Sequence, residues 1–328
     1  MEKIEKFSIY LNKPNFTYLP GEHVTGIVRF RLNEASSVNV IKINLNGGAI
    51  VNWTEEDTDS DGNKQSNSYS VDETYINKDI ILATQKNSNK LYLEINEYDF
   101  PFDFVLPNYL PYSIYDSNGQ IYYLLTALID IPWSSNIKTK LRINIAHSFD
   151  LNSNPSLRHG YEVETLCCGP SKSNPILIKI STLKCGYVPG ERINFSILLK
   201  NFGSRKIDLI EVKFDKCYFY VNSKTNWSIN ISKIMLAGSI RSGEKKAWNN
   251  LELLIPNILS TLPGHIIQIK YFLIFSIKTS CLTFTKEVKI PIVIGTIPFN
   301  NSNPPIVSYP SLESSPPPYN QISNYPKC

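Results

Sequence analysis

The end of the chain carries a motif that could bind a protein partner. Pro316, Pro317 and Tyr319 form, around Pro318, a complete Pro-Pro-x-Tyr sequence. Consecutive prolines favour a polyproline II helix, which loses little conformational entropy when it docks on the aromatic groove of a WW domain. Residues 300–328 are rich in Pro, Ser and Asn and poor in apolar residues, so we expect a disordered tail. Such a tail can also exist without a partner.

A second group of residues could bind a cation. Residues 57–62, Asp-Thr-Asp-Ser-Asp-Gly, match the opening of a calcium loop, in which alternate carboxylates surround a hard cation. Ser68 stands where such a loop closes with a bidentate Glu, and Lys64 stands where an apolar residue is typical. We therefore expect residues 54–74 to form an acidic surface loop that is dispensable for folding, with weak calcium binding as the alternative.

Three cations alternate with apolar or small residues further along the chain. Lys138, Lys140 and Arg142 would share one face of a strand, because side chains in a strand alternate between its two faces. This pattern would suit contacts with phosphate groups on a phosphorylated partner. The alternative is a solvated strand face that discourages aggregation.

Other chemistry finds no support in the sequence. It contains no Gly-x-Ser-x-Gly elbow, no phosphate-binding glycine loop and no His-Glu-x-x-His motif. Six cysteines without a Cys-x-x-Cys pair indicate reduced thiols rather than a metal site. A formal net charge of +4 with scattered basic residues does not indicate nucleic acid binding. We expect no enzymatic activity, no cofactor and no bound metal.

The elements that would position these motifs are organised as a repeat. Residues 18–22 read YLPGE and residues 187–191 read YVPGE. Pro presets the second position of a turn and Gly accepts a positive φ at the third, so each copy predicts a chain reversal. After each turn apolar residues alternate with polar ones, which predicts a strand covered on one face. Further echoes, Tyr123-Leu124-Leu125 and Tyr271-Phe272-Leu273, indicate one module present twice.

Strand-like runs dominate both copies, and no long amphipathic helix is visible. The runs are Val38 to Leu45, Ile121 to Ile131, Leu141 to Ile145, Ile207 to Phe214 and Val288 to Ile294. Pro and Gly interrupt them at short intervals, as in β-sandwiches. We predict an all-β fold of two tandem immunoglobulin-like sandwiches, at 1–153 and 154–299, followed by the tail 300–328.

With these turns and strands, the chain resembles the α-arrestin group of arrestin domain-containing proteins. The matching pieces are YLPGEHVTGIVRF, NGGAIVNW, YDFPFDFVLP, SNGQIYYLLTALIDIPW, DLN at 150–152, CCGPSKSNPILIKI, CGYVPGERINFSILLKNFGSR and PIVIGTIPF. The resemblance rests on the order and spacing of these pieces, and it covers nearly the whole chain. The resemblance implies a pair of arrestin-type sandwiches that bind the cytosolic regions of transmembrane receptors or transporters.

The resemblance also implies a partner for the tail, a HECT-type ubiquitin ligase with WW domains. The chain would then be an adaptor that promotes ubiquitination, endocytosis and sorting of its cargo. Members of the group often carry two Pro-Pro-x-Tyr motifs, whereas here Pro304-Pro305 is followed by Tyr309, one residue too far along. The alternative is a trafficking scaffold of retromer type, or a thioredoxin-binding regulator, that needs no ligase.

The start of the sequence bears on the compartment. Residues 1–10, MEKIEKFSIY, are charged where a secretory signal needs an apolar core, and no apolar stretch reaches the roughly 20 residues of a membrane span. We expect a cytoplasmic protein that reaches the plasma membrane and endosomes peripherally, through its cargo.

Overall fold

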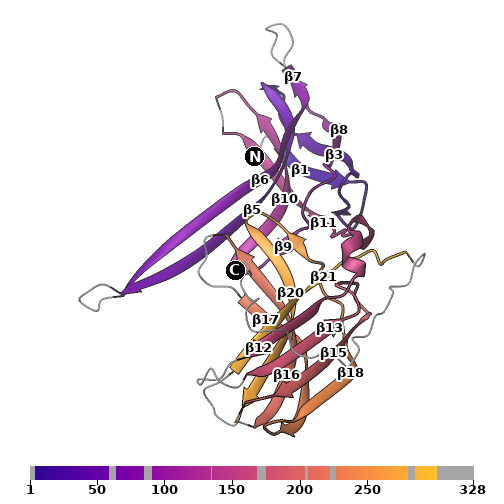
Figure 1. Cartoon of the computed structure of the whole chain (residues 1–328). Helices are drawn as coiled ribbons and strands as arrows, with labels where there is room; N and C mark the ends of the chain where they lie inside the picture. Colours follow the sequence, from indigo (N-terminus) through magenta and orange to yellow (C-terminus); the bar gives the residue numbers. More distant parts are fainter. Residues whose placement is uncertain are drawn as a thin grey trace.

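The chain folds into two β-sandwiches that lie end to end (Figure 1). The computed structural model describes residues 4–58, 64–84, 91–133, 135–167, 175–203, 206–221, 227–279 and 285–300. Two 3-10 helices, η1 (Leu151–Ser153) and η2 (Pro155–Arg158), lie between the sandwiches. The prediction of an all-β fold with two tandem immunoglobulin-like sandwiches is confirmed.

The first sandwich consists of two main sheets. One contains β1, β3 and β8 in that order, the other contains β2, β11, β10, β5 and β6 with β9 paired to β10, and a small sheet joins β4 to β7. The strands are β1 (Ile4–Leu11), β2 (Thr17–Tyr18), β3 (His23–Leu32), β4 (Ser36–Val38), β5 (Val40–Thr58), β6 (Lys64–Thr84), β7 (Leu91–Leu93), β8 (Glu97–Val105), β9 (Ile114–Tyr115), β10 (Gly119–Asp130) and β11 (Ile137–Ile145).

The second sandwich repeats this plan with one addition. Its larger sheet runs β14, β21, β20, β16 and β17 with β19 paired to β20, and its smaller sheet runs β12, β13, β15 and β18. The added strand is β12, which covers the edge that β1 leaves open in the first copy. The strands are β12 (Glu162–Cys167), β13 (Ile176–Thr182), β14 (Gly186–Tyr187), β15 (Arg192–Asn201), β16 (Ile207–Tyr220), β17 (Trp227–Ile240), β18 (Lys245–Leu254), β19 (Leu262–Pro263), β20 (Ile267–Thr279) and β21 (Thr285–Ile294).

Alternating sequence explains why these segments form half-covered strands. In β10 every second residue from Gly119 onward is buried, and β3 and β15 alternate in the same way after their turns. The buried residues of both sandwiches form one continuous apolar cluster, and a smaller cluster around Phe30 fills the outer end of the first sandwich. Burial of these faces supplies most of the driving force for folding.

The duplicated turn is built identically in both copies. Gly21 and Gly190 have φ values of +84° and +91°, in the region that favours glycine. Glu22 accepts hydrogen bonds from the Leu19 amide at 2.9 Å and from the ammonium of Lys13 at 2.8 Å. These bonds lower the pKa of Glu22, the Lys13 contact most. The carboxylate therefore closes the turn in its charged form.

The second copy repeats these bonds. Glu191 accepts the Val188 amide at 2.9 Å and the ammonium of Lys184 at 2.8 Å. Further along, the hydroxyl of Tyr123 donates to the carbonyl of Pro111, and that of Tyr271 to Leu259, both at 2.6 Å. The predicted equivalence of the two Pro-Gly turns is thus confirmed at the level of single hydrogen bonds.

One part of the sequence-based picture is wrong. Residues 54–58 and 64–74, predicted as loop, belong to β5 and β6, which pair with each other from Val40 and Thr84 out to Thr58 and Lys64. The third strand of this part of the sheet, β10, ends opposite Val51. Beyond that point the two strands continue as a two-stranded arm that projects from the body (Figure 1). Cross-strand backbone hydrogen bonds form the arm, and these do not require apolar side chains.

Deleting the arm tests how much it contributes to stability. We replace residues 54–68 by an Asn-Gly turn that joins Trp53 to Tyr69, which stack at a ring distance of 5.4 Å. Because the described residues of this segment form strand pairs only between β5 and β6, we expect the melting temperature to fall by no more than about 4 °C, corresponding to about 1 kcal/mol. Thermal denaturation followed by circular dichroism measures it. A much larger loss would show that the arm is part of the folding unit.

Candidate functional site

The three predicted cations lie on the outer face of the first six-stranded sheet. Lys138, Lys140 and Arg142 are exposed side chains of one face of β11, as their alternation indicates. Their cross-strand neighbours on β10 are Leu128, Thr126 and Leu124. The register continues across β5 and β6, so this face carries polar side chains from four strands.

Two of the three cations line a shallow, open concavity on this face. It is lined by Lys138 and Lys140 on β11, Thr126 and Leu128 on β10, Lys42 and Asn44 on β5, and Asn77 and Asp79 on β6. Asp79 accepts hydrogen bonds from Lys42 at 2.8 Å and from Asn44 at 2.7 Å, which lower its pKa, Lys42 most. Lys42 is thereby neutralised. Lys138 and Lys140 have no ion-pair partner within the described part of the chain.

Arg142 has a different environment from the two lysines. Its guanidinium lies over the ring of Tyr115, 4.6 Å from the centroid, and it does not line the concavity. Stacking of this kind fixes a guanidinium in place while leaving its N–H groups available. The structure thus places two of the predicted cations together and the third beside them.

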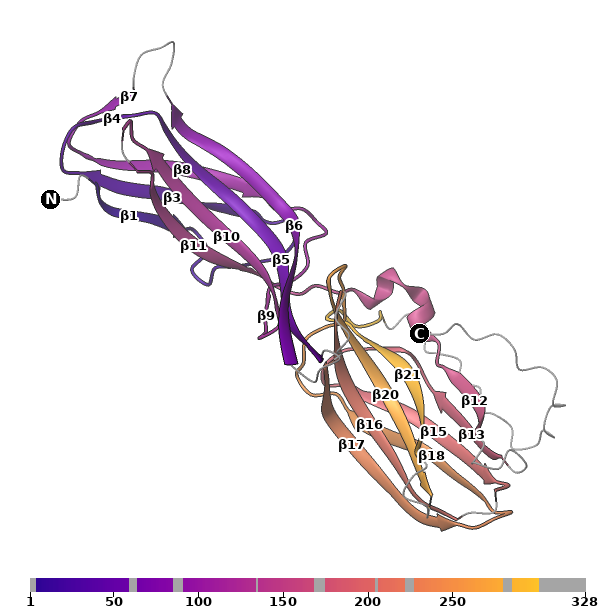
Figure 2. The same cartoon turned by 90° about the vertical axis from the view of Figure 1, so that its left-hand side faces the viewer.

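The two sandwiches meet at a joint that buries polar contacts. The hydroxyl of Tyr112, before β9, donates to the carbonyl of Ser260, before β19, at 2.7 Å, and both residues are buried. Gly119 opens β10 against the second sandwich, where an added Cβ would lie 2.9 Å from the ring of Tyr220 and 3.1 Å from Ile267. Figure 2 shows the two sandwiches meeting end to end near β9, with the short helices beside the junction. Glycine is needed here for close approach.

A partly buried histidine lies in the same joint. The ring of His147 is 5.4 Å from that of Tyr112, and its Nδ1 is buried with no hydrogen-bond partner in the described ranges. Burial lowers the pKa of His147, because the charged form loses hydration there.

The base of the tail is fixed to the segment between the sandwiches. Asn152 donates to the carbonyl of Pro298 at 2.9 Å and accepts from the amide of Asn300 at 3.0 Å. The guanidinium of Arg158 lies 4.5 Å from the ring centre of Phe299 and bonds the carbonyl of Asn300. This explains the DLN piece at 150–152, whose role the sequence did not reveal. The tail therefore leaves the molecule at a fixed point next to the joint.

Other sequence-predicted sites lie outside the described residues. They are Pro316, Pro317 and Tyr319 of the Pro-Pro-x-Tyr motif, and Asp59, Asp61 and Gly62 of the calcium-loop pattern. In the part of the chain that the structure describes, no group of three metal-binding side chains occurs. No helix among the described residues is long and apolar enough to cross a membrane.

Comparison with known proteins identifies the family. A family model of the arrestin (or S-antigen) N-terminal domain matches residues 7–152, and one of the arrestin C-terminal domain matches residues 172–299. The chain belongs to the arrestin domain-containing proteins. This family has an adaptor role, and the two sandwiches described above are the arrestin domains of this chain.

Similar proteins cover most of the chain. Arrestin domain-containing protein 17 of Caenorhabditis elegans is 28% identical over 317 residues, which span 91% of this chain and 72% of the relative. Human arrestin domain-containing protein 1 is 26% identical over 318 residues, 95% and 69% of the two chains. The thioredoxin-interacting protein of Sus scrofa is 23% identical over 303 residues, 90% and 75% of the two chains.

The joint makes a prediction about pH. His147 has a lowered pKa in the folded protein, so the unfolded chain binds its proton more tightly and acid favours unfolding. Its contribution is complete above the ordinary pKa of 6.5 and is lost as the pH falls below that value. We expect His147→Gln to reduce the loss of stability between pH 7.5 and pH 5.5, measured by urea denaturation.

The exposed His159 supplies the control. His159→Gln should leave the pH dependence of the wild type unchanged. Equal pH dependence in wild type and His147→Gln would show that the joint does not sense protonation of this ring.

Proposed function

We propose that this arrestin domain-containing protein links membrane-protein cargo to a ubiquitin ligase. Its sandwiches bind the cytosolic region of a transmembrane receptor or transporter. Its tail binds a WW domain of a HECT-type ligase through Pro316, Pro317 and Tyr319, which leads to ubiquitination, endocytosis and sorting of the cargo. The observation that carries the proposal is a complete Pro-Pro-x-Tyr motif in the same chain as two arrestin domains, C-terminal to both.

The anchored tail base supports this arrangement. Pro316 is 16 positions after Asn300, so the motif lies at most roughly 55 Å from the fixed point beside the joint, at about 3.4 Å per extended residue. A ligase bound there is held close to whatever the sandwiches bind, because a short tether raises its effective concentration. The proposed boundaries are therefore 153/154 between the two sandwiches and 299/300 between the second sandwich and the tail.

The cations of the outer face are proposed cargo contacts. Lys138 and Lys140 lack ion-pair partners within the described ranges and line a common concavity, and the stacked Arg142 lies next to them. Phosphate groups on a cargo tail would suit this arrangement, since lysine and arginine bind them by charge-assisted hydrogen bonds. The site of action would be the cytoplasmic side of the plasma membrane and of endosomes.

The alternative is a ligase-independent scaffold or a thioredoxin-binding regulator. A relative is named for its interaction with thioredoxin. Thiol exchange with such a partner needs an accessible thiolate. Cys185 and Cys217 are both buried, and burial raises the pKa of Cys185 to about 11. The described thiols therefore offer this alternative no support.

A peptide titration tests the tail. A peptide of residues 311–325 is titrated with ligase WW domains as wild type, Pro318→Ala, Tyr319→Ala and phosphotyrosine 319. In a polyproline II helix Pro316 and Tyr319 share one edge and Pro317 lies on the next, so Pro318 should tolerate change. Tyr319→Ala removes the ring that fills its own pocket, and phosphate adds charge to an apolar pocket. We expect both to weaken binding at least tenfold.

The full chain carries the test further. The Tyr319→Ala protein should keep its cargo and no longer promote ubiquitination of that cargo. Equal affinity of all four peptides would show that the motif is a bystander, and the scaffold would then become the better account.

A further inference from the structure

The outer end of the first sandwich exposes a tryptophan in an unusual conformation. Trp133, in the turn between β10 and β11, has a relative exposure of 102% and a φ of +59°. A bulky residue rarely adopts this left-handed backbone, because its Cβ is crowded by the following carbonyl oxygen. A glycine would remove both the backbone strain and the exposed ring, so folding alone does not account for tryptophan here.

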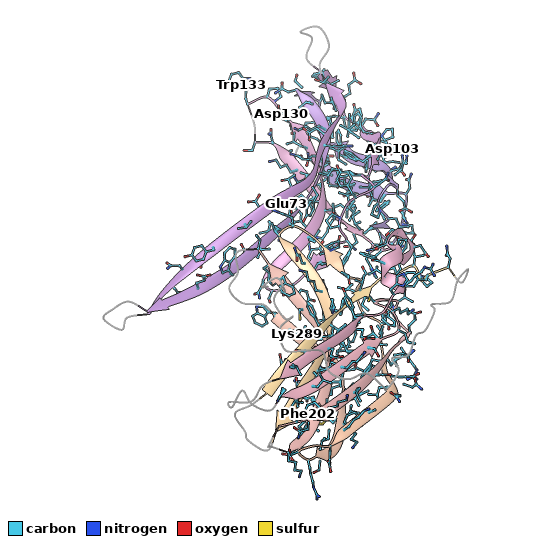
Figure 3. All side chains as sticks on the ribbon, in the orientation of Figure 1. Glu73, Asp103, Asp130, Trp133, Phe202 and Lys289 are labelled. Carbon is cyan, nitrogen blue, oxygen red and sulfur yellow. The ribbon has the colours of Figure 1, made fainter. Side chains whose placement is uncertain are left out.

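Other exposed apolar side chains occur at the same end. Tyr92 on β7 and Ile95 just after it are 62% and 65% exposed. Figure 1 places β7 at the end of the first sandwich remote from the second, and Figure 3 shows Trp133 at that end. Together with Trp133, these side chains make this end of the sandwich apolar. A surface that faces only water does not need such a group of exposed apolar side chains.

The charges on the hairpin behind Trp133 are mostly positive. Between Gly119 and Ile145 the cations are Lys138, Lys140 and Arg142, and the only carboxylate is Asp130. Asp130 accepts a hydrogen bond from Asn39 at 3.3 Å, and Glu94 lies after the neighbouring β7. The two lysines have no ion-pair partner within the described ranges. A tryptophan tip with lysines behind it is the arrangement that suits the boundary between lipid and water.

We propose that this end of the first sandwich docks directly on an anionic membrane surface. The indole of Trp133 enters the interfacial region, and Lys138 and Lys140 lie against the lipid phosphates. Membrane contact is then a property of the chain itself, in addition to any contact made through cargo. The surface is separate from the Pro-Pro-x-Tyr tail and does not depend on a ligase.

The test measures binding of the full-length protein to vesicles. Wild type, Trp133→Gly, Lys138→Gln/Lys140→Gln and the control Trp227→Ser are mixed with phosphatidylcholine vesicles, with or without about 30 mol% phosphatidylserine. Trp227 is the matched control because it is 57% exposed on β17 of the second sandwich. Brominated lipids report whether an indole enters the bilayer, since bromine quenches its fluorescence.

The expected results separate folding from binding. Trp133→Gly should keep or raise the melting temperature, because glycine accepts the positive φ, while losing vesicle binding at least about tenfold together with the bromine quenching. The lysine pair should lose about tenfold on anionic vesicles and little on neutral ones. Trp227→Ser and Tyr319→Ala should bind vesicles as the wild type does.

Three results would overturn the proposal. The first is a wild type that binds neither kind of vesicle, and the second is Trp133→Gly binding as tightly as wild type. The third is a lysine pair that loses a serine-phosphorylated peptide but keeps its vesicle binding, which would assign these lysines to cargo alone. Loss of WW binding by the tail would leave this proposal intact.

Discussion

One buried hydrogen bond between the two halves of the chain fixes the shape on which the rest depends. Tyr112 in the first sandwich donates to the carbonyl of Ser260 in the second, out of contact with water. Leaving a buried carbonyl unpaired costs about 1–3 kcal/mol, a large part of the stability of a typical domain. Close packing adds to this bond, because Gly119 lets the ring of Tyr220 approach the backbone of β10. The joint therefore has one close-packed geometry.

The joint also organises what surrounds it. The segment that leaves the first sandwich and the one that leaves the second are bonded to each other, through Asn152, Arg158 and Phe299. As a result the tail begins beside the joint rather than at a remote end of the molecule. For an adaptor this matters, because its two partners must be held together by one rigid body and one tether.

Much of the fold could be predicted from sequence because its signals are local. The Pro-Gly turns and the alternation that follows them act within a few residues, and the repeated Tyr123 and Tyr271 each donate to a carbonyl only 12 positions earlier. The arm could not be predicted in this way, since polar residues such as Ser66 and Asn67 pair through their backbones and give no apolar alternation. The joint could not be predicted for another reason. Tyr112 and Ser260 are 148 positions apart in the sequence, and only the tertiary fold brings them together.

Some features of the candidate site could be predicted from the sequence, and others required the structure. The shared face of Lys138, Lys140 and Arg142 follows from strand periodicity. The neutralisation of Lys42 by Asp79 depends instead on the pairing of strands that are 37 positions apart in sequence. The Pro-Pro-x-Tyr motif could be predicted from the sequence alone, because a WW domain recognises a short linear segment that needs no surrounding fold. The proposed function thus combines a tail motif that the sequence predicts with a pair of sandwiches whose surface only the structure describes.

Proximity labelling in cells is the most direct measurement of the central claim that the sandwiches bind cargo and the tail binds a ligase. Full-length wild type and Tyr319→Ala, each fused to a labelling enzyme, are compared under the same conditions. The account predicts that HECT-type ligases disappear from the Tyr319→Ala set while transmembrane receptors or transporters remain. A wild-type set without such ligases, or a loss of transmembrane proteins together with them, would contradict it.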